Sequence, residues 1–510
     1  MNSDNNFYIT TPIYYVNDAP HIGHAYTSIA SDVLARFMRL DGKNVKFLTG
    51  TDEHGQKIAK SAEAKGKNPQ EFCDEISLKF RELGQLLDLT NDDFIRTTEQ
   101  RHKKAAIAVW ERLKERGHIY QSKYKGWYSV RDEAFYAESE ITDDKKAPTG
   151  APVEWVEEES YFFDLSKWQD KLLEFYEANA DFIFPRSRRN EVISFVKSGL
   201  IDLSISRTSF KWGIEVPGDE RHVMYVWLDA LTNYISAIGF PDEKSEDYIN
   251  FWPANIHMVG KDIIRFHAVY WPAFLMATGL PLPKKIVAHG WWTKEGEKIS
   301  KSVGNVIVPS QLVEEFGLDY VRYFLLREVI FGSDGDYSRI NLINRVNSEL
   351  ANKIGNLLQR SLSMISKNCE GKIPKVSSDI YHHNVLLQKA EKILVQVKIA
   401  LSLPEFSSAL GLIVELAEEA NLYIDNQAPW ALRKTDFSKM EEVLYVLAET
   451  SRYIAILLQA FVPSSAAKML DQLGVKESHR SFAYLNKDSR LLSGTEIPEP
   501  KGIFPRFEEK

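Results

Sequence analysis

The feature that most constrains the fold is a strand, a turn and a helix at the start of the chain. Phe7–Val16 is a short apolar run rich in aromatic and β-branched residues, which predicts a buried strand that ends near Pro20. Apolar residues then recur at helical spacing over 22–39, and a second buried strand is predicted at 43–49. This order of elements opens a doubly wound, Rossmann-like parallel sheet of the α/β class.

The pattern along the chain divides it into five predicted segments. The α/β pattern covers 1–116 and resumes over 223–290, so we expect both parts to form one Rossmann-like domain. Between them, 117–222 has short alternating stretches and acidic clusters, which indicate an α+β insertion. Residues 291–340 contain a polar loop bracketed by glycines, and 341–510 is typical of successive helices, which predict a C-terminal α-helical bundle.

Composition excludes several classes of protein. The net charge of −8 disfavours a nonspecific nucleic-acid binder, although an acidic total still permits a local RNA-binding patch. The two cysteines, Cys73 and Cys369, argue against a disulfide framework and a Cys-rich zinc site. No apolar run approaches the ~18–20 residues that a membrane span needs, and the N-terminus has no features of a signal or transit peptide. We therefore expect a cytoplasmic protein without a membrane partner.

The first chemical signal is the motif His21-Ile22-Gly23-His24, directly after the first strand. Backbone N–H groups at a helix start favour anions, and Gly23 allows a nucleotide to approach the backbone closely. Both histidines can stabilise charge that develops on the α-phosphate of a bound triphosphate. The alternative is a pair of surface histidines at a helix start, and these four residues alone do not decide between the two.

The second signal is Lys298-Ile299-Ser300-Lys301-Ser302, on the polar loop between Gly296 and Gly304. A lysine there is a mobile point charge suited to a pyrophosphate leaving group, and the glycines allow the loop to close. The alternative is a solvated basic loop, which is favoured when the five residues are considered alone.

Together, the two motifs resemble the signature motifs of class I aminoacyl-tRNA synthetases in order, spacing and setting. Ile299 stands where that class usually has methionine, a volume-conserving change. Four further segments are similar to methionyl-tRNA synthetases: Ile13–Asn17, Thr51–Gly55, Val226–Tyr234 and Gly260–His267. The resemblance implies a methionine–tRNA ligase that forms methionyl-adenylate from methionine and ATP with Mg²⁺. Methionine then passes to the 3′-terminal adenosine of initiator and elongator tRNA(Met).

The resemblance also implies roles for residues in these segments. The catalytic residues are expected to be His21, His24, Lys298 and Lys301, and ATP is expected to contact these together with Gly23, Gly260, Ser300 and, at the ribose, Asp262. The methionine side chain is expected to contact Ile13, Tyr15, Trp227, Ala230, Leu231, Tyr234, Ile263 and His267, with Asp52 on the ammonium group. A sulfur atom favours aromatic edges, which agrees with this pocket. The alternative is that its aromatic residues are ordinary core residues.

Arg207 matches a family position near the substrate carboxylate and the acceptor end of tRNA. A structural ion pair is the alternative for this arginine, and the sequence leaves both open.

A helix near 345–363 has an apolar stripe of Val346, Leu350, Ile354, Leu357 and Leu358. Asn352, Asn356 and Arg360 follow at i, i+4 and i+8 on the opposite face. A second helix near 409–424 leads to a Pro-Trp corner at Trp430. These elements resemble the anticodon-reading part of the family, so Asn352, Asn356, Arg360 and Trp430 are the implied anticodon contacts. The alternative is a solvated helix face and a buried tryptophan.

The sequence departs from many relatives in the insertion. The segment 126–136 has no cysteine, so it resembles the zinc-free, single-knuckle form and no zinc is expected. The chain also lacks the extra C-terminal tRNA-binding, dimerising barrel of some relatives, so we expect a monomer. Two rivals remain. Another class I synthetase is disfavoured by the missing zinc-ligating cysteines and the short insertion, and a non-catalytic RNA-binding module is disfavoured by the intact motifs.

Overall fold

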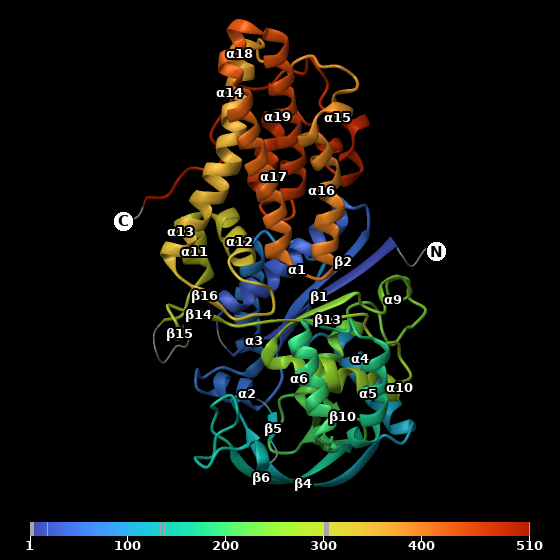
Figure 1. The fold of residues 1–510 in the computed structure, drawn as a ribbon. Helices are drawn as coiled ribbons and strands as arrows, with labels where there is room; N and C mark the ends of the chain where they lie inside the picture. The colour runs from blue at the N-terminus through green and yellow to red at the C-terminus, as the bar shows by residue number, and fades with distance from the viewer. Residues whose placement is uncertain (1–4, 18, 133, 137, 300–304, 509–510) are drawn as a thin grey trace. The chain divides into compact units, whose positions relative to one another are not determined.

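The computed structural model describes residues 5–17, 19–132, 134–136, 138–299 and 305–508. The chain forms two compact units (Figure 1). Unit 1 comprises 1–31 and 45–289, and unit 2 comprises 32–44 and 290–510. Helix α1 (Ile22–Leu40) therefore contributes its first half to unit 1 and its second half to unit 2.

Unit 1 is built on a six-stranded sheet in the order β3-β2-β1-β12-β13-β7. The pairs β2–β3, β1–β12, β12–β13 and β13–β7 are parallel. The strands are β1 (Asn6–Tyr15), β2 (Asn44–Asp52), β3 (Asp93–Arg96), β12 (Ile256–Gly260), β13 (Ile286–His289) and β7 (Ile183–Phe184). The strand order reverses between β1 and β12, where open α/β sheets bind their ligands. The predicted doubly wound fold is confirmed.

Buried apolar residues on both faces explain why these strands are nearly continuous hydrophobic runs. One core cluster packs α4 (Gln100–Glu115) and α10 (Trp271–Thr278) onto the sheet through Trp110 and Phe274, among others. A second cluster packs α2 (Gln56–Glu63) and α3 (Pro69–Leu86) near Tyr14.

The insertion is a mixed α+β segment of unit 1, as expected. Its main sheet has the order β5-β4-β6-β8, built from β4 (Ile119–Ser129), β5 (Ala134–Tyr136), β6 (Glu154–Phe163) and β8 (Leu203–Ser204). A smaller sheet joins β9 (Ser206–Arg207), β10 (Glu215–Val216) and β11 (Asp219–Met224). Helices α5 (Gln169–Ala178) and α6 (Arg186–Lys197) complete the segment.

Unit 2 contains the predicted C-terminal helical bundle. Its helices are α11 (Pro309–Phe316), α12 (Leu318–Arg327), α13 (Arg339–Arg345), α14 (Asn356–Asn368), α15 (Ile380–His383), α16 (Val385–Ser402), α17 (Phe406–Gln427), α18 (Pro429–Thr435), α19 (Phe437–Leu458) and α20 (Pro463–Gln472). Helix α19 is buried on nearly every side from Val443 onward, which makes it the central helix. Figure 1 shows α14, α16 and α17 packed around it.

The second half of α1 is tied to the rest of unit 2 by a buried ion pair. Asp32 accepts from Nη2 of Arg322 at 2.8 Å, and both side chains are fully buried. Arg322 also donates to the carbonyl oxygens of Ala460 and Phe461. A buried charge is tolerated only when it is paired and hydrogen-bonded in this way.

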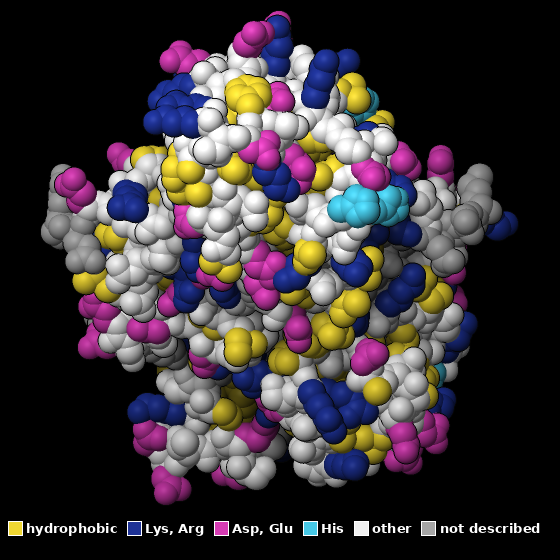
Figure 2. All heavy atoms as spheres, turned by 45° about the horizontal axis from the view of Figure 1, so that its top comes forward, with side chains coloured by type: hydrophobic (Ala, Val, Ile, Leu, Met, Phe, Trp, Pro, Cys, Tyr) yellow, Lys and Arg dark blue, Asp and Glu magenta, His cyan; other side chains and the backbone are white. Residues whose placement is uncertain are grey.

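No helix in the described part of the chain is both long and apolar enough to cross a membrane. On the face drawn in Figure 2, acidic and basic side chains are interspersed.

Candidate active site

The carboxyl ends of four neighbouring strands lie at one edge of the sheet in unit 1. Strand β2 ends at Asp52, β1 at Tyr15, β12 at Gly260 and β13 at His289. This edge flanks the switch point of the sheet, and α1 begins beside it at Ile22. The parallel fold thus brings together groups that are far apart in the sequence.

Backbone N–H groups hold each of the two motif histidines in one tautomer. The backbone N–H of His21 donates to Nδ1 of His24 at 3.1 Å, and the N–H of Gly23 donates to Nδ1 of His21 at 3.1 Å. A ring nitrogen that accepts a hydrogen bond carries no proton, so the neutral ring carries its proton on Nε2. Burial, together with His21 beside it, holds the pKa of His24 well below its usual value. His24 is therefore a neutral Nε2–H donor.

Gly23 is required by this arrangement. A Cβ at Gly23 would lie 2.9 Å from Cε1 of His21, so any side chain would displace the ring. Aromatic contacts fix the other ring, because His24 packs edge-on against Tyr14 at 4.9 Å and Phe80 at 5.1 Å. A cavity of about 480 Å³ opens beside Tyr14 and Phe80, and none of the residues expected to contact methionine lines it.

Asp52 and Glu53 are adjacent buried carboxylates with different surroundings. Glu53 accepts from Arg96 at 2.6 and 3.0 Å and from Thr98 at 2.5 Å, so its charge is neutralised within the fold. Asp52 is the last residue of β2 and is 7% exposed. Glu53 therefore belongs to an ion-pair network of the fold, whereas the role of Asp52 at the ammonium group stays a prediction.

The predicted methionine pocket is assembled from α7 (Val226–Leu231), α8 (Asn233–Ser236) and the π-helical turn η5 (Phe266–Tyr270). The ring of Trp227 stacks on Phe266 at 3.6 Å and faces His267 edge-on at 6.4 Å. Tyr15 packs with Trp227 in one apolar cluster. Of the other predicted residues, Leu231 and Tyr234 belong to the main core cluster, and Ile13 and Ile263 pack against it. Ala230 is buried on α7.

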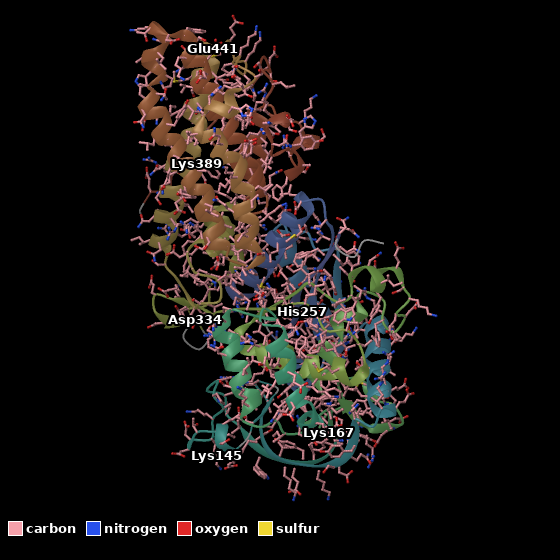
Figure 3. The ribbon with its side chains drawn as sticks, turned by 45° about the vertical axis from the view of Figure 1, so that its right-hand side comes forward. Lys145, Lys167, His257, Asp334, Lys389 and Glu441 are labelled. Atoms are coloured by element: carbon pink, nitrogen blue, oxygen red, sulfur yellow. The ribbon has the colours of Figure 1, made fainter. Side chains whose placement is uncertain are left out.

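Two of the residues predicted to contact methionine, Tyr234 and His267, form a buried polar pair. The Tyr234 hydroxyl lies 2.6 Å from Nε2 of His267, whose Nδ1 donates to the carbonyl of Ile263 at 3.0 Å. Burial lowers the pKa of His267 to about 4, so this ring is neutral at pH 7. Tyr234 also stacks on His257 of β12 at 4.0 Å (His257 is labelled in Figure 3).

Gly260 and Asp262 occupy the turn that follows β12. The short 3₁₀ helix η4 (Lys261–Ile263) begins there, and the side chain of Asp262 is exposed. A Cβ at Gly260 would lie 2.5 Å from Oδ1 of Asp262. The glycine therefore allows this carboxylate to lie against the backbone at the sheet edge.

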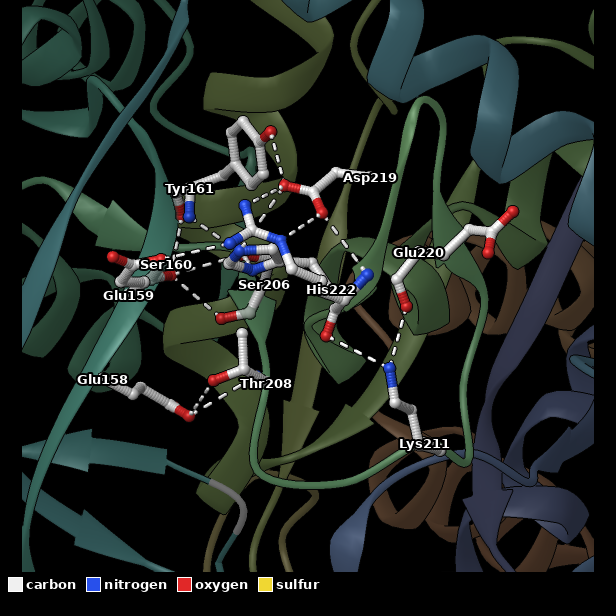
Figure 4. A network of polar contacts seen from close by, with 11 residues as sticks. Glu158, Glu159, Ser160, Tyr161, Ser206, Thr208, Lys211, Asp219, Glu220 and His222 are labelled. Carbon is white, nitrogen blue, oxygen red and sulfur yellow. Dashed lines mark hydrogen bonds and ion pairs between the residues drawn. The ribbon is translucent and has the colours of Figure 1, made fainter.

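Arg207 lies in the smaller sheet of the insertion, on β9. It is 2% exposed, forms an ion pair with Glu158, and packs over the ring of Tyr128 at 4.1 Å. Figure 4 shows the polar network around the same strands, in which Thr208 also donates to Glu158 and Ser206 contacts His222. The burial of Arg207 favours the interpretation as a structural ion pair over a contact with the substrate carboxylate or the acceptor end of tRNA.

The sequence predicts a polar loop from Lys294 onward. Instead, the lysine-rich motif begins in unit 2 on a β-hairpin. Strand β14 (Trp292–Lys294) pairs with β15 (Glu297–Lys298) through a two-residue turn, Glu295 and Gly296, with positive φ at both positions. Strand β14 also pairs with β16 (Gly335–Tyr337). Ser300 and Lys301 lie outside the described residues, as does the side chain of Lys298.

The predicted anticodon residues share one region of unit 2. The helix runs from Arg339 through Asn368, and its predicted apolar stripe is buried. Asn352 and Asn356 are exposed on the other face. Arg360 pairs with Asp425 at 2.7 Å and lies 5.5 Å from the ring of Trp430. Trp430 is 48% exposed, which contradicts the alternative that it is a buried tryptophan.

One feature of this helix had no signal in the sequence. Its middle part, η6 (Val346–Gly355), is π-helical. Nδ2 of Asn421 on α17 donates to the carbonyl of Lys353 at 2.9 Å, within the π-helical stretch. Such stretches are rare and recur at functional sites.

Sequence reasoning also missed polar residues that support the site. His289, at the end of β13, lies 2.7 Å from Oγ1 of Thr27 on α1. Asp229 of α7 bonds to both His54 and His102. His54 and Asp229 stand inside segments that the resemblance had singled out, but nothing near His102 in the sequence indicates this contact.

The cysteine-free segment of the insertion forms a hairpin between β4 and β5. Asp132 accepts from the hydroxyls of Tyr136, at 3.0 Å, and Thr149. Among the described residues, no group of three or more His, Cys, Asp or Glu is arranged to bind a metal ion.

Comparisons with known proteins identify a family for each part of the chain. The family described as tRNA synthetases class I (M) matches residues 7–150 and 139–362. The family described as the anticodon binding domain of methionyl tRNA ligase matches residues 373–510.

Individual relatives match over nearly their whole length. A methionine–tRNA ligase of Rickettsia bellii (strain RML369-C) is 64% identical over 509 residues, which are 99% of this chain and 100% of the relative. One of Rhizobium meliloti (strain 1021) is 55% identical over 99% of both chains. A solved structure of Mycobacterium tuberculosis methionyl-tRNA synthetase in complex with methionyl-adenylate is 50% identical, with a TM-score of 0.94 over 98% of this chain and 100% of that chain.

Proposed function

The chain belongs to the methionyl-tRNA synthetase family of class I aminoacyl-tRNA synthetases, and from this premise we propose how its own residues carry out the reaction. It is a methionine–tRNA ligase that activates methionine with ATP and transfers it to tRNA. We assign the first step to the sheet edge of unit 1.

In this proposal, Asp52 binds the ammonium group of methionine, and the thioether side chain lies among the aromatic residues of α7, α8 and η5. The side-chain contacts are Ile13, Tyr15, Trp227, Ala230, Leu231, Tyr234, Ile263 and His267. A carboxylate satisfies the charge of the ammonium group, and aromatic edges suit the polarisable sulfur. The methionine carboxylate is then held for in-line attack on the α-phosphorus of ATP.

ATP binds across the start of α1, with Gly260 and Asp262 on the adenosine. The Nε2–H groups of His21 and His24 donate to phosphate oxygens, where negative charge develops during attack. Both rings need their Nδ1 acceptors occupied by backbone N–H groups to present Nε2 as the donor, and the bonds of His21 and Gly23 support this. Lys298, Ser300 and Lys301 stabilise the departing pyrophosphate.

Mg²⁺ would accompany the triphosphate in this proposal and would neutralise part of its charge. The described residues offer no cluster of acidic or imidazole ligands for it, so no step is assigned to a metal held by the protein. In the second step, the terminal ribose hydroxyl of tRNA attacks the carbonyl carbon of methionyl-adenylate and AMP leaves. The anticodon of initiator and elongator tRNA(Met) contacts Asn352, Asn356, Arg360 and Trp430.

The observation that carries the proposal is the arrangement of His21 and His24 at the start of α1, where the Nδ1 atom of each ring accepts a backbone N–H group. It is tested by ATP–pyrophosphate exchange with each of the twenty amino acids, without tRNA. We expect exchange with methionine alone. Lys301→Ala is expected to reduce the rate about 10²–10³-fold, because it removes a group that stabilises developing charge.

Lys294→Ala is the matched control, since this lysine lies on the same hairpin before the motif. It should exchange at nearly the wild-type rate. Exchange with a different amino acid would refute the pocket assignment. Absence of exchange with any amino acid would favour a non-catalytic RNA-binding module.

We also propose that the enzyme acts as a cytoplasmic monomer. Both cysteines are free thiols, which suits a reducing compartment. Light scattering of the purified protein should give the mass of one chain, and a dimer mass would overturn the proposal.

A further inference from the structure

A buried polar chain in unit 1 has no part in the chemistry proposed above. Asp229 accepts from Nδ1 of His54 at 2.6 Å and from Nε2 of His102 at 2.7 Å. Nδ1 of His102 lies 3.0 Å from Oγ of Ser236. All four residues are buried, with 3% exposure or less. The chain links the turn after β2 to helices α4, α7 and α8.

This hydrogen-bond chain holds the ionised carboxylate of Asp229 inside the core. Burial by itself raises the pKa of Asp229, but the charges and N–H donors of His54 and His102 outweigh it and hold that pKa well below its ordinary value. A buried carboxylate without such donors is strongly unfavourable. The two N–H donors therefore hold the Asp229 side chain in place, because without them it would be a buried charge lacking these partners.

Two directly bonded members of this hydrogen-bond chain, His54 and Asp229, belong to the two halves of the proposed amino-acid site. His54 follows Asp52 by two residues, on the turn that ends β2. Asp229 lies on α7 between Trp227 and Ala230. The direct bond between His54 and Asp229 is thus a short connection between the ammonium carboxylate and the helix that supplies the side-chain pocket.

The same turn is held on its other side by Trp212. Nε1 of Trp212 donates to the carbonyl of Glu53 at 2.5 Å, and the N–H of Gly55 donates to the carbonyl of Trp212 at 3.1 Å. The ring of Trp212 packs edge-on against His54 at 5.5 Å. His54 is therefore the residue through which this turn is hydrogen-bonded to α7.

We propose that His54, Asp229 and His102 are positioning residues that set the distance between the ammonium site and the thioether pocket. The inference rests on the proposed function of the sheet edge. An amino acid bound at two points gains from the second contact only when both contacts are correctly spaced. Breaking this hydrogen-bond chain should reduce how much the ammonium group adds to the affinity of a ligand whose side chain is already bound. It should leave ATP binding at the start of α1 unchanged.

The test compares two inhibitors of ATP–pyrophosphate exchange that differ only in the ammonium group. These are L-methioninol and its analogue without the amino group, 4-(methylthio)butan-1-ol. The inhibition constant of the amino-free analogue divided by that of L-methioninol measures how much the ammonium group contributes to binding. In His54→Ala this ratio should fall about tenfold relative to wild type, as expected for coupled contacts, with the KM for ATP unchanged.

His54→Asn is the matched variant, because its amide nitrogen lies near the position of Nδ1 and can still donate to Asp229. It should keep the ratio within about threefold of wild type. Ser236→Ala removes the outermost bond, together with the bond of Oγ to the carbonyl of Asn233, and provides the measurement if His54→Ala does not fold. Its ratio should fall by about threefold.

Two results would overturn the inference. One is an equal weakening of both inhibitors in His54→Ala, or in Ser236→Ala if that variant is used, since the ratio would then be unchanged. The other is a loss in His54→Asn as large as in His54→Ala, since the hydrogen bond would not be the cause. Wild-type enzyme that does not exchange with methionine would instead refute the proposed function, so the two failures are distinguishable.

Discussion

Tyr234 and His267 are joined by a hydrogen bond of 2.6 Å whose direction is set by a third group. Because Nδ1 of His267 donates to the carbonyl of Ile263, Nε2 of the neutral ring is an acceptor and the Tyr234 hydroxyl donates to it. The proton of Tyr234 is thus directed to His267. A methionine sulfur in this pocket would meet aromatic edges and a hydroxyl oxygen.

Removing this hydroxyl should weaken methionine binding. Tyr234→Phe leaves Nε2 of His267 buried without its donor, a loss of about 1–3 kcal/mol. The KM for methionine in pyrophosphate exchange should therefore rise about tenfold, with a smaller change in the KM for ATP. Tyr8→Phe is the control, because its hydroxyl donates to the backbone of Tyr234 at 2.8 Å and not to the pocket. An equal rise in both variants would contradict a specific role of the hydroxyl.

Acid should destabilise the fold through His267. Its pKa is about 4 in the folded protein and about 6.5 when unfolded, so between these values the unfolded state binds more protons. The free energy of unfolding should therefore be unaffected by this group above pH 6.5 and should fall by about 3 kcal/mol as the pH decreases through 4.

The measurement is urea unfolding of wild type and His267→Gln at pH 7 and pH 4, followed by tryptophan fluorescence. The variant should lose less stability between the two pH values than wild type. The same pH dependence in both proteins would show that His267 does not titrate in this way.

The tautomer of His24 predicts which of its variants forms methionyl-adenylate faster. Glutamine places an amide N–H near the position of Nε2, whereas asparagine is one methylene shorter and reaches only the position of Nδ1, where its oxygen can accept from the His21 N–H. His24→Asn should lower the rate of methionyl-adenylate formation about 10²–10³-fold, as for loss of one donor to a developing charge. His24→Gln should be about tenfold faster than His24→Asn. Rapid-quench kinetics would measure both, and the reverse order would contradict the assigned tautomer.

The exposed ring of Trp430 should matter for tRNA but not for activation. Stacking of a base on an aromatic side chain contributes about 1–3 kcal/mol, so Trp430→Ala should raise the KM for tRNA(Met) at least about fivefold. Pyrophosphate exchange without tRNA should remain unchanged. Lys392→Ala, at an exposed position on α16, serves as the control in the aminoacylation assay. A matching rise in the control would indicate a general loss of charge or stability.

Several elements followed directly from the sequence. The first strand, α1 and the apolar stripe over 346–358 are periodic patterns of buried residues, and hydrophobic periodicity is a local property that the chain carries whatever its neighbours are. The two motifs indicated a nucleotide site only together, through their resemblance to the signature motifs of class I synthetases. The π-helical stretch of η6 was not predicted, because its backbone geometry depends on contacts such as that of Asn421.

Tertiary structure alone decided which distant residues act together. The pairing of β1 with β12 places Ile9 beside Ile256, and the bond between His102 and Asp229 spans 127 positions. Neither has a local signal, because such contacts arise only when strands and helices pack. The same packing buries Arg207 against Glu158 and sets the proton positions of His24 and His267. The sequence thus determined the elements and the chemical groups, while packing determined their partners, their charge and their direction.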